Sequence, residues 1–348
     1  MTRHGRTSRR TVRGRRRLAV AASIAVLAVT AATGAFAAGW RPSLASTLPG
    51  AVATTGPTTS PAPSASPSPT PSPTPTPPAD IEITLVAAGD VLTHEPVTID
   101  ARTADGGYDF TGEMAPVQAW VSGADLALCH LEVPVAPAGT APSGYPRFGA
   151  PVQIVSSLAS VGWDGCSTAS NHSVDRGQDG VAATLDALDA AGLGHAGTAR
   201  TEQEAATTQV YALQREGRTL RVAQVSATFG TNGLPVPADR PWSVELIDTA
   251  EIVRQATAAR AAGADLVVAS IHCCEEYVSE PTARQVEFAQ DLAASGAVDL
   301  VIGHHAHVPQ PIVHLDGGPR GEGMWVAYGL GNFLSNQGAH CCTARSDS

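Results

Sequence analysis

From residue 80 onward, short apolar runs alternate with segments in which apolar residues recur at helical spacing. The runs are four to nine residues long, rich in Val, Ile, Leu and Ala, and several end in a polar residue. Apolar runs of this kind are typical of strands that are buried on both faces of a parallel sheet. Strands are predicted at 81–90, 124–132, 163–172, 218–227, 264–272, 297–305 and 324–333, and helices at 151–162, 180–192, 248–263 and 281–296. The alternation predicts an α/β domain with largely parallel strands.

Polar residues follow the carboxyl ends of five of these strands. They are Asp90, Glu132, the pair Asn171-His172, His272, and His304 with His307. In open α/β sheets, ligands bind at the carboxyl ends of the strands. We therefore expect these side chains to converge on one edge of the sheet, although any one of them taken alone is an ordinary loop residue.

The first 38 residues carry a different pattern. Residues 1–17 hold eight arginines and form a basic head, and residues 18–38 follow as a run of 21 residues without charge. Such a run is long enough to span a membrane, with the arginines holding its start in the cytoplasm. A cleaved signal peptide is the alternative, because Ala35-Phe36-Ala37 fits a cleavage site. Either reading predicts an extracytoplasmic body, membrane-anchored or secreted, with the cytoplasmic membrane as a partner.

Residues 39–80 form a Pro/Ser/Thr-rich linker that ends in SPSPTPSPTPTPP. The tract has few apolar side chains to bury and many fixed φ angles, so it is expected to stay extended. The predicted organisation is thus a head at 1–17, a membrane anchor or signal peptide at 18–38, the linker at 39–80 and one domain at 81–348.

Charge separates the same two parts of the chain. The formal net charge is -10, but from Asp80 onward 13 Arg face 32 acids, which leaves the body at -19. Because nucleic-acid backbones require a basic surface, we expect no nucleic-acid partner for the body.

The strand-end residues combine carboxylates, an amide and imidazoles. Mixed oxygen and nitrogen ligands suit Zn, Mn or Fe, and a carboxylate flanked by imidazoles can hold two metals that activate water. His172 stands three residues before Asp175, so it can be held as a proton donor to a leaving group. The alternative is that Asn171-His172 only caps a turn.

These residues occur in a series of motifs that resembles a known family. The motifs are Gly89-Asp90, Leu131-Glu132, Ser170-Asn171-His172 with Asp175 and Gly177, His272 with Glu276-Tyr277, Gly303-His304-His305-Ala306-His307-Val308 and Tyr328-Gly329-Leu330-Gly331-Asn332-Phe333. In this order, over residues 81–337, they resemble the CapA family of bacterial poly-γ-glutamate capsule biosynthesis proteins. That family is similar to calcineurin-like metallophosphatases, which implies a layered β-sandwich flanked by helices and a dinuclear metal centre.

The resemblance implies a role for each site residue. The implied ligands of two divalent metals are Asp90, Glu132, Asn171, His272, His304 and His307, with Glu132 in the bridging position. His172 would be the proton donor and Asp175 the residue that orients it. His305 stays open as a ligand, and His94 is either a further ligand or a histidine of a substrate-facing loop.

The chain departs from the family pattern at three places. His130 stands where an Asn usually precedes Leu-Glu, and Cys273-Cys274 replaces a usual Trp-Gly. The chain also ends at Ser348, soon after Asn332-Phe333, where further β structure is expected.

Six cysteines in an exported body suggest disulfides. We expect the adjacent pairs Cys273-Cys274 and Cys341-Cys342 to cross-link two loops, and Cys129 and Cys166 to pack as small apolar residues. A cysteine-rich zinc site is the alternative, but no pair has the C-x-x-C spacing.

The leading functional hypothesis is an envelope protein for the synthesis, export or attachment of an anionic capsule polymer such as poly-γ-glutamate, with a metal-dependent hydrolase site. The alternatives are a secreted metal-dependent phosphoesterase and a non-catalytic scaffold of a polymer-synthesis complex. Fold alone does not choose among them, because function belongs to the site.

Overall fold

The computed structural model describes residues 80–338. The basic head, the apolar run at 18–38 and nearly all of the linker lie outside the described residues, as do Cys341 and Cys342. Within 80–338, none of the helices combines the length and the apolar character needed to cross a membrane.

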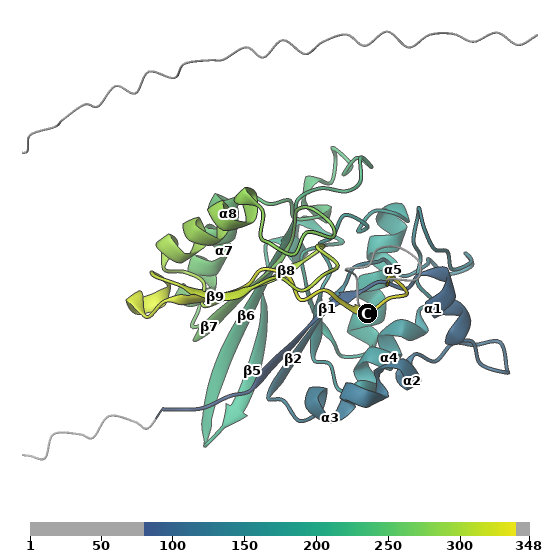
Figure 1. Cartoon of the computed structure of the whole chain (residues 1–348), viewed down its shortest axis with the longest axis horizontal. Coiled ribbons are helices and arrows are strands. Elements are labelled where there is room, and N and C mark those ends of the chain that lie inside the picture. The colour runs from purple at the N-terminus through teal and green to yellow at the C-terminus, as the bar shows by residue number, and fades with distance from the viewer. Residues whose placement is uncertain (1–79, 339–348) are drawn as a thin grey trace, which may run out of the picture. The chain divides into compact units, whose positions relative to one another are not determined.

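Eleven strands form two sheets in the described part of the chain (Figure 1). The first sheet is parallel throughout, in the order β11 (Asn332–Leu334), β1 (Leu85–Val91), β2 (Leu126–Leu131), β3 (Gly165–Ser167) and β4 (Gly194–Ala196). The second has the order β5 (Gln209–Arg215), β6 (Arg218–Thr228), β7 (Leu266–His272), β8 (Leu300–His304), β10 (Met324–Ala327) and β9 (Ile312–Leu315). Its outer strands β5 and β9 are antiparallel to their neighbours, and the four strands between them are parallel.

Helices connect the strands. The α-helices are α1 (Glu95–Asp100), α2 (Thr111–Met114), α3 (Gln118–Val121), α4 (Gln153–Val161), α5 (Gly177–Ala190), α6 (Glu202–Ala205), α7 (Thr249–Ala261) and α8 (Ala283–Ser295), and the 3-10 turns are η1 (Ala115–Val117), η2 (Pro241–Ser243) and η3 (Pro319–Gly321). The side chain of Asp248 caps α7, and Thr282 with Gln285 forms a capping box at α8. Such caps satisfy backbone N–H groups that have no partner within the helix.

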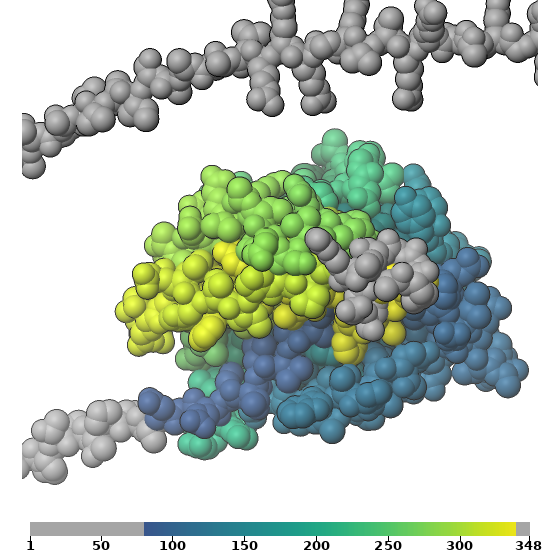
Figure 2. All heavy atoms as spheres, in the orientation of Figure 1, coloured from purple at the N-terminus to yellow at the C-terminus, as the bar shows by residue number. Residues whose placement is uncertain are grey.

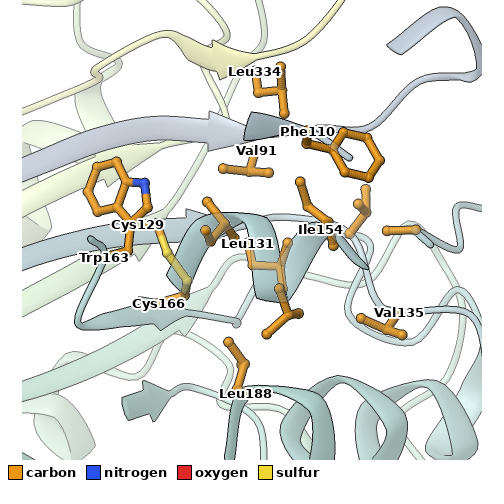
Figure 3. Packing of buried hydrophobic residues seen from close by; sticks show 14 of the residues in the cluster. Val91, Phe110, Cys129, Leu131, Val135, Ile154, Trp163, Cys166, Leu188 and Leu334 are labelled. Carbon is orange, nitrogen blue, oxygen red and sulfur yellow. A yellow bond between two sulfur atoms is a disulfide. The ribbon is translucent and has the colours of Figure 1, made fainter. Parts of the chain in front are cut away.

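Three apolar clusters hold the layers together. One packs the first sheet against α4 and α5, and includes Leu131, Ile154 and Leu188 (Figure 3). A second packs the other sheet against α7 and α8, and a third, with Leu128, Val222 and Ile302, lies between the two sheets. The order of layers is therefore helices, sheet, sheet, helices, which confirms the predicted α/β class with layered sheets flanked by helices.

The predicted strand at 324–333 is in fact two strands in different sheets. β10 extends the second sheet, and after a turn with Gly331 at φ 71° the chain enters the first sheet as β11. Gly329 and Gly331 interrupt an otherwise apolar run, and glycine tolerates this turn because it has no Cβ. Figure 2 shows the C-terminal residues (yellow) between the α7–α8 region (green) and the first strands and helices (blue).

The prediction for Cys129 and Cys166 was wrong. They form a disulfide in the core, because the parallel register of β2 and β3 places them opposite each other (Figure 3). Cys273 is bonded to its neighbour Cys274. The expected link of these two residues to Cys341 and Cys342 involves residues that lie outside the described chain.

Candidate metal centre

The strand ends of both sheets meet at the candidate site. β1 delivers Asp90 and β2 leads into Glu132, both in the first sheet, whereas β7 and β8 of the second sheet end at His272 and His304. Asp90 is in register with His130 on β2, and His272 with His304 on β8. The expected convergence therefore occurs, but between two facing sheets rather than along the edge of one.

One carboxylate lies with two imidazoles in a first triad, formed by Asp90, His130 and His304. The Oδ1 atom of Asp90 is 3.4 Å from Nδ1 of His304 and 3.9 Å from Nε2 of His130. The two imidazole rings stack with their centroids 4.0 Å apart. All three side chains are buried.

Glu132, His305 and His307 form a second buried triad. Nε2 of His307 lies 3.7 Å from Oε1 of Glu132, and its Nδ1 lies 3.1 Å from Oδ2 of Asp90. His307 thus stands between the two carboxylates and joins the triads. Its Nδ1 also lies 2.9 Å from the side-chain oxygen of Asn332, which as an acceptor orients the ring.

The loop after β8 holds two of these histidines in an uncommon conformation. His305 has φ 82° and His307 has φ 53°, in the left-handed region that non-glycine residues seldom adopt. The N–H of His305 donates to Oδ2 of Asp90 over 3.2 Å. Strained backbone of this kind is concentrated at functional sites, where the surrounding structure holds it.

The donor atoms of both triads fit metal ions. Five of them are buried without a hydrogen-bond partner within the described residues: Oδ1 of Asp90, both carboxylate oxygens of Glu132, Nδ1 of His304 and Nδ1 of His305. An unsatisfied buried polar group costs about 1–3 kcal/mol, and more when it is charged. Divalent cations would satisfy all five, and the mixture of oxygen and nitrogen donors suits Mn, Fe or Zn.

The protonation of the cluster follows from burial and from neighbouring charge. Burial raises the pKa of Glu132 to about 7, although His307 opposes this. Burial alone would lower the pKa of His307, but the carboxylates of Glu132 and Asp90 raise it to about 10. Without metal, the protonated His307 thus supplies positive charge between the carboxylates, so metal binding is expected to release that proton.

Three of the other imidazoles, those of His130, His272 and His305, are held neutral. Burial lowers the pKa of His305 to about 3, and burial with neighbouring histidines lowers the pKa values of His130 and His272 well below 6.5. Neutral imidazole is the form that binds metal. These nitrogens are therefore available as ligands at neutral pH.

Asn171 and His272 lie beside the triads rather than in them. The Nε2 atom of His272 is 3.1 Å from Oδ1 of Asn171 and 3.9 Å from Oε1 of Glu132, and its Nδ1 is 3.0 Å from Nε2 of His130. Of the six ligands that the resemblance implies, four are in the triads: Asp90, Glu132, His304 and His307. His272 adjoins Glu132 and His130, and Asn171 contacts His272.

The sequence reasoning did not assign His130 to the metal site. It treated this residue only as a departure from the family pattern. A usable signal was present, because His130 and Glu132 are two residues apart within the predicted strand 124–132 and alternate residues of a strand point to the same side.

The predicted proton donor lies next to the cluster, on a cleft of about 380 Å³ that His172, His307 and Tyr277 help to line. Nδ1 of His172 is 2.6 Å from Oδ2 of Asp175. The same oxygen accepts the N–H of Phe148 over 2.8 Å. This pairing holds the imidazole in place and leaves Nε2 as the nitrogen that can exchange a proton.

His94 lies in the wall of the same cleft and in neither triad. Its ring meets the edge of Phe148, with centroids 5.3 Å apart, and its Nδ1 is 3.3 Å from Oγ of Ser335. Burial lowers its pKa to about 4, so it is neutral at physiological pH. Among the described residues His94 therefore belongs to the wall of the cleft and not to the candidate metal ligands.

Comparison with known proteins agrees with the motif series. The profile of the family described as bacterial capsule synthesis protein PGA_cap matches residues 84–337. The capsule biosynthesis protein CapA of Bacillus anthracis is 28% identical over 190 residues, which cover 53% of this chain and 43% of the relative. The PGA biosynthesis protein CapA of Bacillus subtilis is 39% identical over 75 residues, which cover 22% of this chain and 18% of the relative.

The matched stretches thus span less than half of each of these two relatives. Among solved structures, the NAD nucleotidase of Haemophilus influenzae aligns with 52% of this chain and 36% of its own, at 13% identity and a TM-score of 0.37.

Proposed function

Because this chain belongs to the PGA_cap family of bacterial capsule synthesis proteins, we propose that it acts on an anionic capsule polymer of the poly-γ-glutamate type at a hydrolytic site with two metals. The observation that carries the proposal is the pair of joined, buried triads, in which five carboxylate and imidazole atoms have no hydrogen-bond partner among the described residues. The printed names of its relatives, a capsule biosynthesis protein and a PGA biosynthesis protein, supply the polymer class.

The chain's own residues divide the chemical work. Asp90, His130 and His304 would hold one ion, and Glu132, His305 and His307 the other, with His272 and Asn171 fixing the orientation of the cluster. Bound divalent metals would supply an activated water and neutralise charge on the scissile group. His172, held by Asp175, donates a proton from Nε2 to the leaving group.

The cleft determines what can reach this site. Phe148, Tyr277 and Leu92 form apolar and aromatic walls, and Glu95 and Glu276 line the same opening. A substrate therefore approaches through a mouth that is partly acidic and partly aromatic. Metal ions bound at the cluster would balance the negative charge of the substrate, whereas the residues that line the opening of the cleft would not.

We place the domain outside the cytoplasm. This part of the proposal rests on the arginine-rich head followed by the uncharged run at 18–38 and the Pro/Ser/Thr-rich linker. These features favour an anchored or secreted body that works at the cell envelope.

A secreted metal-dependent phosphoesterase is the second candidate. The pairing of His172 with Asp175 beside two carboxylate–imidazole triads favours it, because the same arrangement suits displacement at phosphorus. A scaffold that keeps the metals for structure alone is the third reading. In that case metal would stabilise the fold, but loss of His172 would change no reaction.

One experiment separates these readings. The full-length chain is purified, its bound metals are counted by mass spectrometry, and turnover is measured on γ-linked glutamate polymer and on a panel of phosphodiesters. The proposal predicts two metals and cleavage of the polymer. Cleavage of phosphodiesters alone would establish the second candidate, and two metals without turnover on either class would establish the scaffold.

A further inference from the structure

A second hollow adjoins the cleft of the metal centre. It has a volume of about 630 Å³, and its lining includes Arg102, Tyr108 and Arg147. Glu95 and Tyr145 line both this hollow and the cleft that contains His172 and His307. The two spaces therefore meet at Tyr145, and we call the second one the outer hollow.

The segment between the two spaces is a closed hairpin. Ser143 and Gly149 exchange backbone hydrogen bonds of 3.0 and 2.9 Å, and Oγ of Ser143 donates to the carbonyl of Arg147 over 2.6 Å. Arg176 stabilises the hairpin, because its Nη1 donates a hydrogen bond of 2.7 Å to Oγ of Ser143. Tyr145 lies within this hairpin with 81% of its surface exposed.

The hairpin is also tied to the catalytic pair. Phe148 donates its N–H to Asp175, and the Phe148 ring packs edge-on against His172 with centroids 4.7 Å apart. Contact with Tyr145 is therefore made on a preorganised loop, which keeps the entropic cost of binding low. A ligand that crosses Tyr145 also reaches the loop that orients the proton donor.

The outer hollow differs in charge from the cleft. Glu95 lies at the junction and lines both spaces, Glu276 lines only the cleft, and Arg102 and Arg147 line only the outer hollow. Neither of these arginines forms an ion pair with a carboxylate among residues 80–338. By contrast, Arg200, Arg254 and Arg260 each pair with acids. Two unpaired guanidinium groups at one hollow of an acidic domain are suited to bind carboxylate or phosphate.

We propose that the outer hollow is a second subsite that holds an anionic segment of a chain-like substrate while another segment of the same chain lies at the metal centre. Arg102 and Arg147 bind the anionic groups, and Tyr145 packs against the chain between the two spaces. Glu95 at the junction repels a carboxylate there, so the charged groups bind beyond Tyr145. The inference rests on the proposed function and adds that the site takes an extended polymer.

The test compares ligands of different length. Binding of γ-linked glutamate oligomers of about two and about ten units to the full-length, metal-loaded chain is measured by calorimetry. We expect the long oligomer to bind more tightly than the short one. The double variant Arg102→Ala/Arg147→Ala should lose about tenfold in affinity for the long oligomer and little for the short one, because each guanidinium makes charge-assisted contacts. Tyr145→Ala should weaken the long oligomer in the same way.

A matched control is Arg284→Ala, which removes an exposed arginine of α8 that does not line either space. It should bind both oligomers as the wild type does, and Arg102→Lys/Arg147→Lys should keep part of the affinity. If the Arg102→Ala/Arg147→Ala variant binds the long oligomer as tightly as the wild type, the subsite is wrong while the proposed polymer stands. If the wild type binds neither oligomer, the polymer and the subsite are both wrong.

Discussion

Nδ1 of His172 lies 2.6 Å from Oδ2 of Asp175, and that oxygen also accepts the backbone N–H of Phe148. The two contacts fix the imidazole between the second triad and the cleft. Among residues 80–338, His172 Nε2 has one long polar contact of 3.5 Å, to the side-chain nitrogen of Asn232. The pair therefore has the geometry of a positioned acid, and several consequences of the site can be measured.

The first prediction concerns this pair. His172→Asn should lower kcat about 10²–10⁴-fold on any substrate that the wild type turns over, with metal content unchanged, because a positioned general acid contributes that much. Steady-state kinetics with metal analysis checks it. His195→Asn is the matched control. His195 forms a similar pair, with its Nε2 3.1 Å from Oδ1 of Asp189, and this pair lies outside the cluster. A kcat within twofold of the wild type would remove His172 from the mechanism.

The second prediction concerns metal removal. Chelation should lower the Tm of the full-length chain, because it removes a ligand that binds the folded state and leaves the buried carboxylates of Asp90 and Glu132 with only the protonated His307 as counter-charge. Metal at 100 times its Kd stabilises by about 2.7 kcal/mol. In Asp90→Asn the chelator should lower the Tm less than in the wild type, since one triad has lost its anionic ligand and only the triad of Glu132 still holds an ion. Thermal unfolding with and without chelator measures this. Glu322→Gln, an exposed acid, is the control. A chelator shift in Asp90→Asn equal to that of the wild type would contradict the assignment.

The third prediction concerns the acid side of the stability profile without metal. Four imidazoles, three of them buried and that of His94 partly buried, have pKa values below 6.5: His94, His130, His272 and His305. As the pH falls below 6.5, the unfolded chain takes up protons at these residues and the folded chain does not. Glu132 has the opposite effect on stability, because its pKa is raised to about 7 in the folded state and the folded chain therefore takes up one proton there before the unfolded chain does. The imidazoles outnumber it, so stability falls toward acid pH.

The expected fall in stability toward alkaline pH follows from the raised pKa values of His307 and Glu132. The pKa of His307 is raised to about 10, so its contribution is complete below pH 6.5 and is lost as the pH rises through 10. Glu132 likewise loses its contribution as the pH rises through about 7. Thermal unfolding in chelator from pH 5 to 9 should show greatest stability near pH 6.5–7. Added metal should remove the alkaline decline, because it replaces the proton on His307. A steady rise in stability from pH 5 to 9 would contradict the alkaline argument, and stability that does not fall below pH 6.5 would contradict the acid one.

The fourth prediction concerns His130. Its two ring nitrogens contact Oγ of Ser167 over 2.8 Å and Nδ1 of His272 over 3.0 Å, and it belongs to the triad of Asp90. His130→Asn should weaken the affinity for one of the two ions about 10–100-fold and leave the other ion in place. The substitution removes a metal-binding imidazole together with its contacts to Ser167 and His272. Calorimetric metal titration measures this. His314→Asn on the edge strand β9 is the control. Equal binding of both ions by His130→Asn would exclude His130 as a ligand.

The fifth prediction concerns the core disulfide. Removing it in Cys129→Ala/Cys166→Ala should lower the free energy of unfolding by about 3 kcal/mol, because the cross-link closes a loop of 37 residues in the unfolded chain. Denaturant unfolding without reductant measures the loss. With reductant, wild type and variant should converge. Equal stability without reductant would show that the two sulfur atoms are not joined in the purified protein.

Much of the fold could be predicted from local pattern. The apolar runs that end at Asp90, Glu132, His272 and His304 are strands, or lead directly out of strands, as expected. The pattern could not show that these strands belong to two sheets, because strands buried on both faces have the same apolar composition in either arrangement. It also could not divide 324–333, where the break between β10 and β11 depends on the neighbours of each half.

The candidate site shows the same division. Spacing and residue type were enough to select Asp90, Glu132, His304, His307 and the His172–Asp175 pair. They did not select His130 as a ligand, and they did not predict the disulfide between Cys129 and Cys166. Both misses concern β2, where partners come from register with β1 and β3 rather than from nearby sequence. Register between parallel strands depends on packing across long connections, which no local window contains.

The sequence alone therefore determined most of the candidate site residues, the α/β class and the acidic character of the body, because these depend on composition and short-range periodicity. Tertiary structure alone decided that two sheets face each other, that His307 lies between Asp90 and Glu132, and that Tyr145 separates the cleft from the outer hollow. Those relationships join residues far apart in the chain. They exist only after burial of the apolar faces has brought the strand ends and the hairpin together.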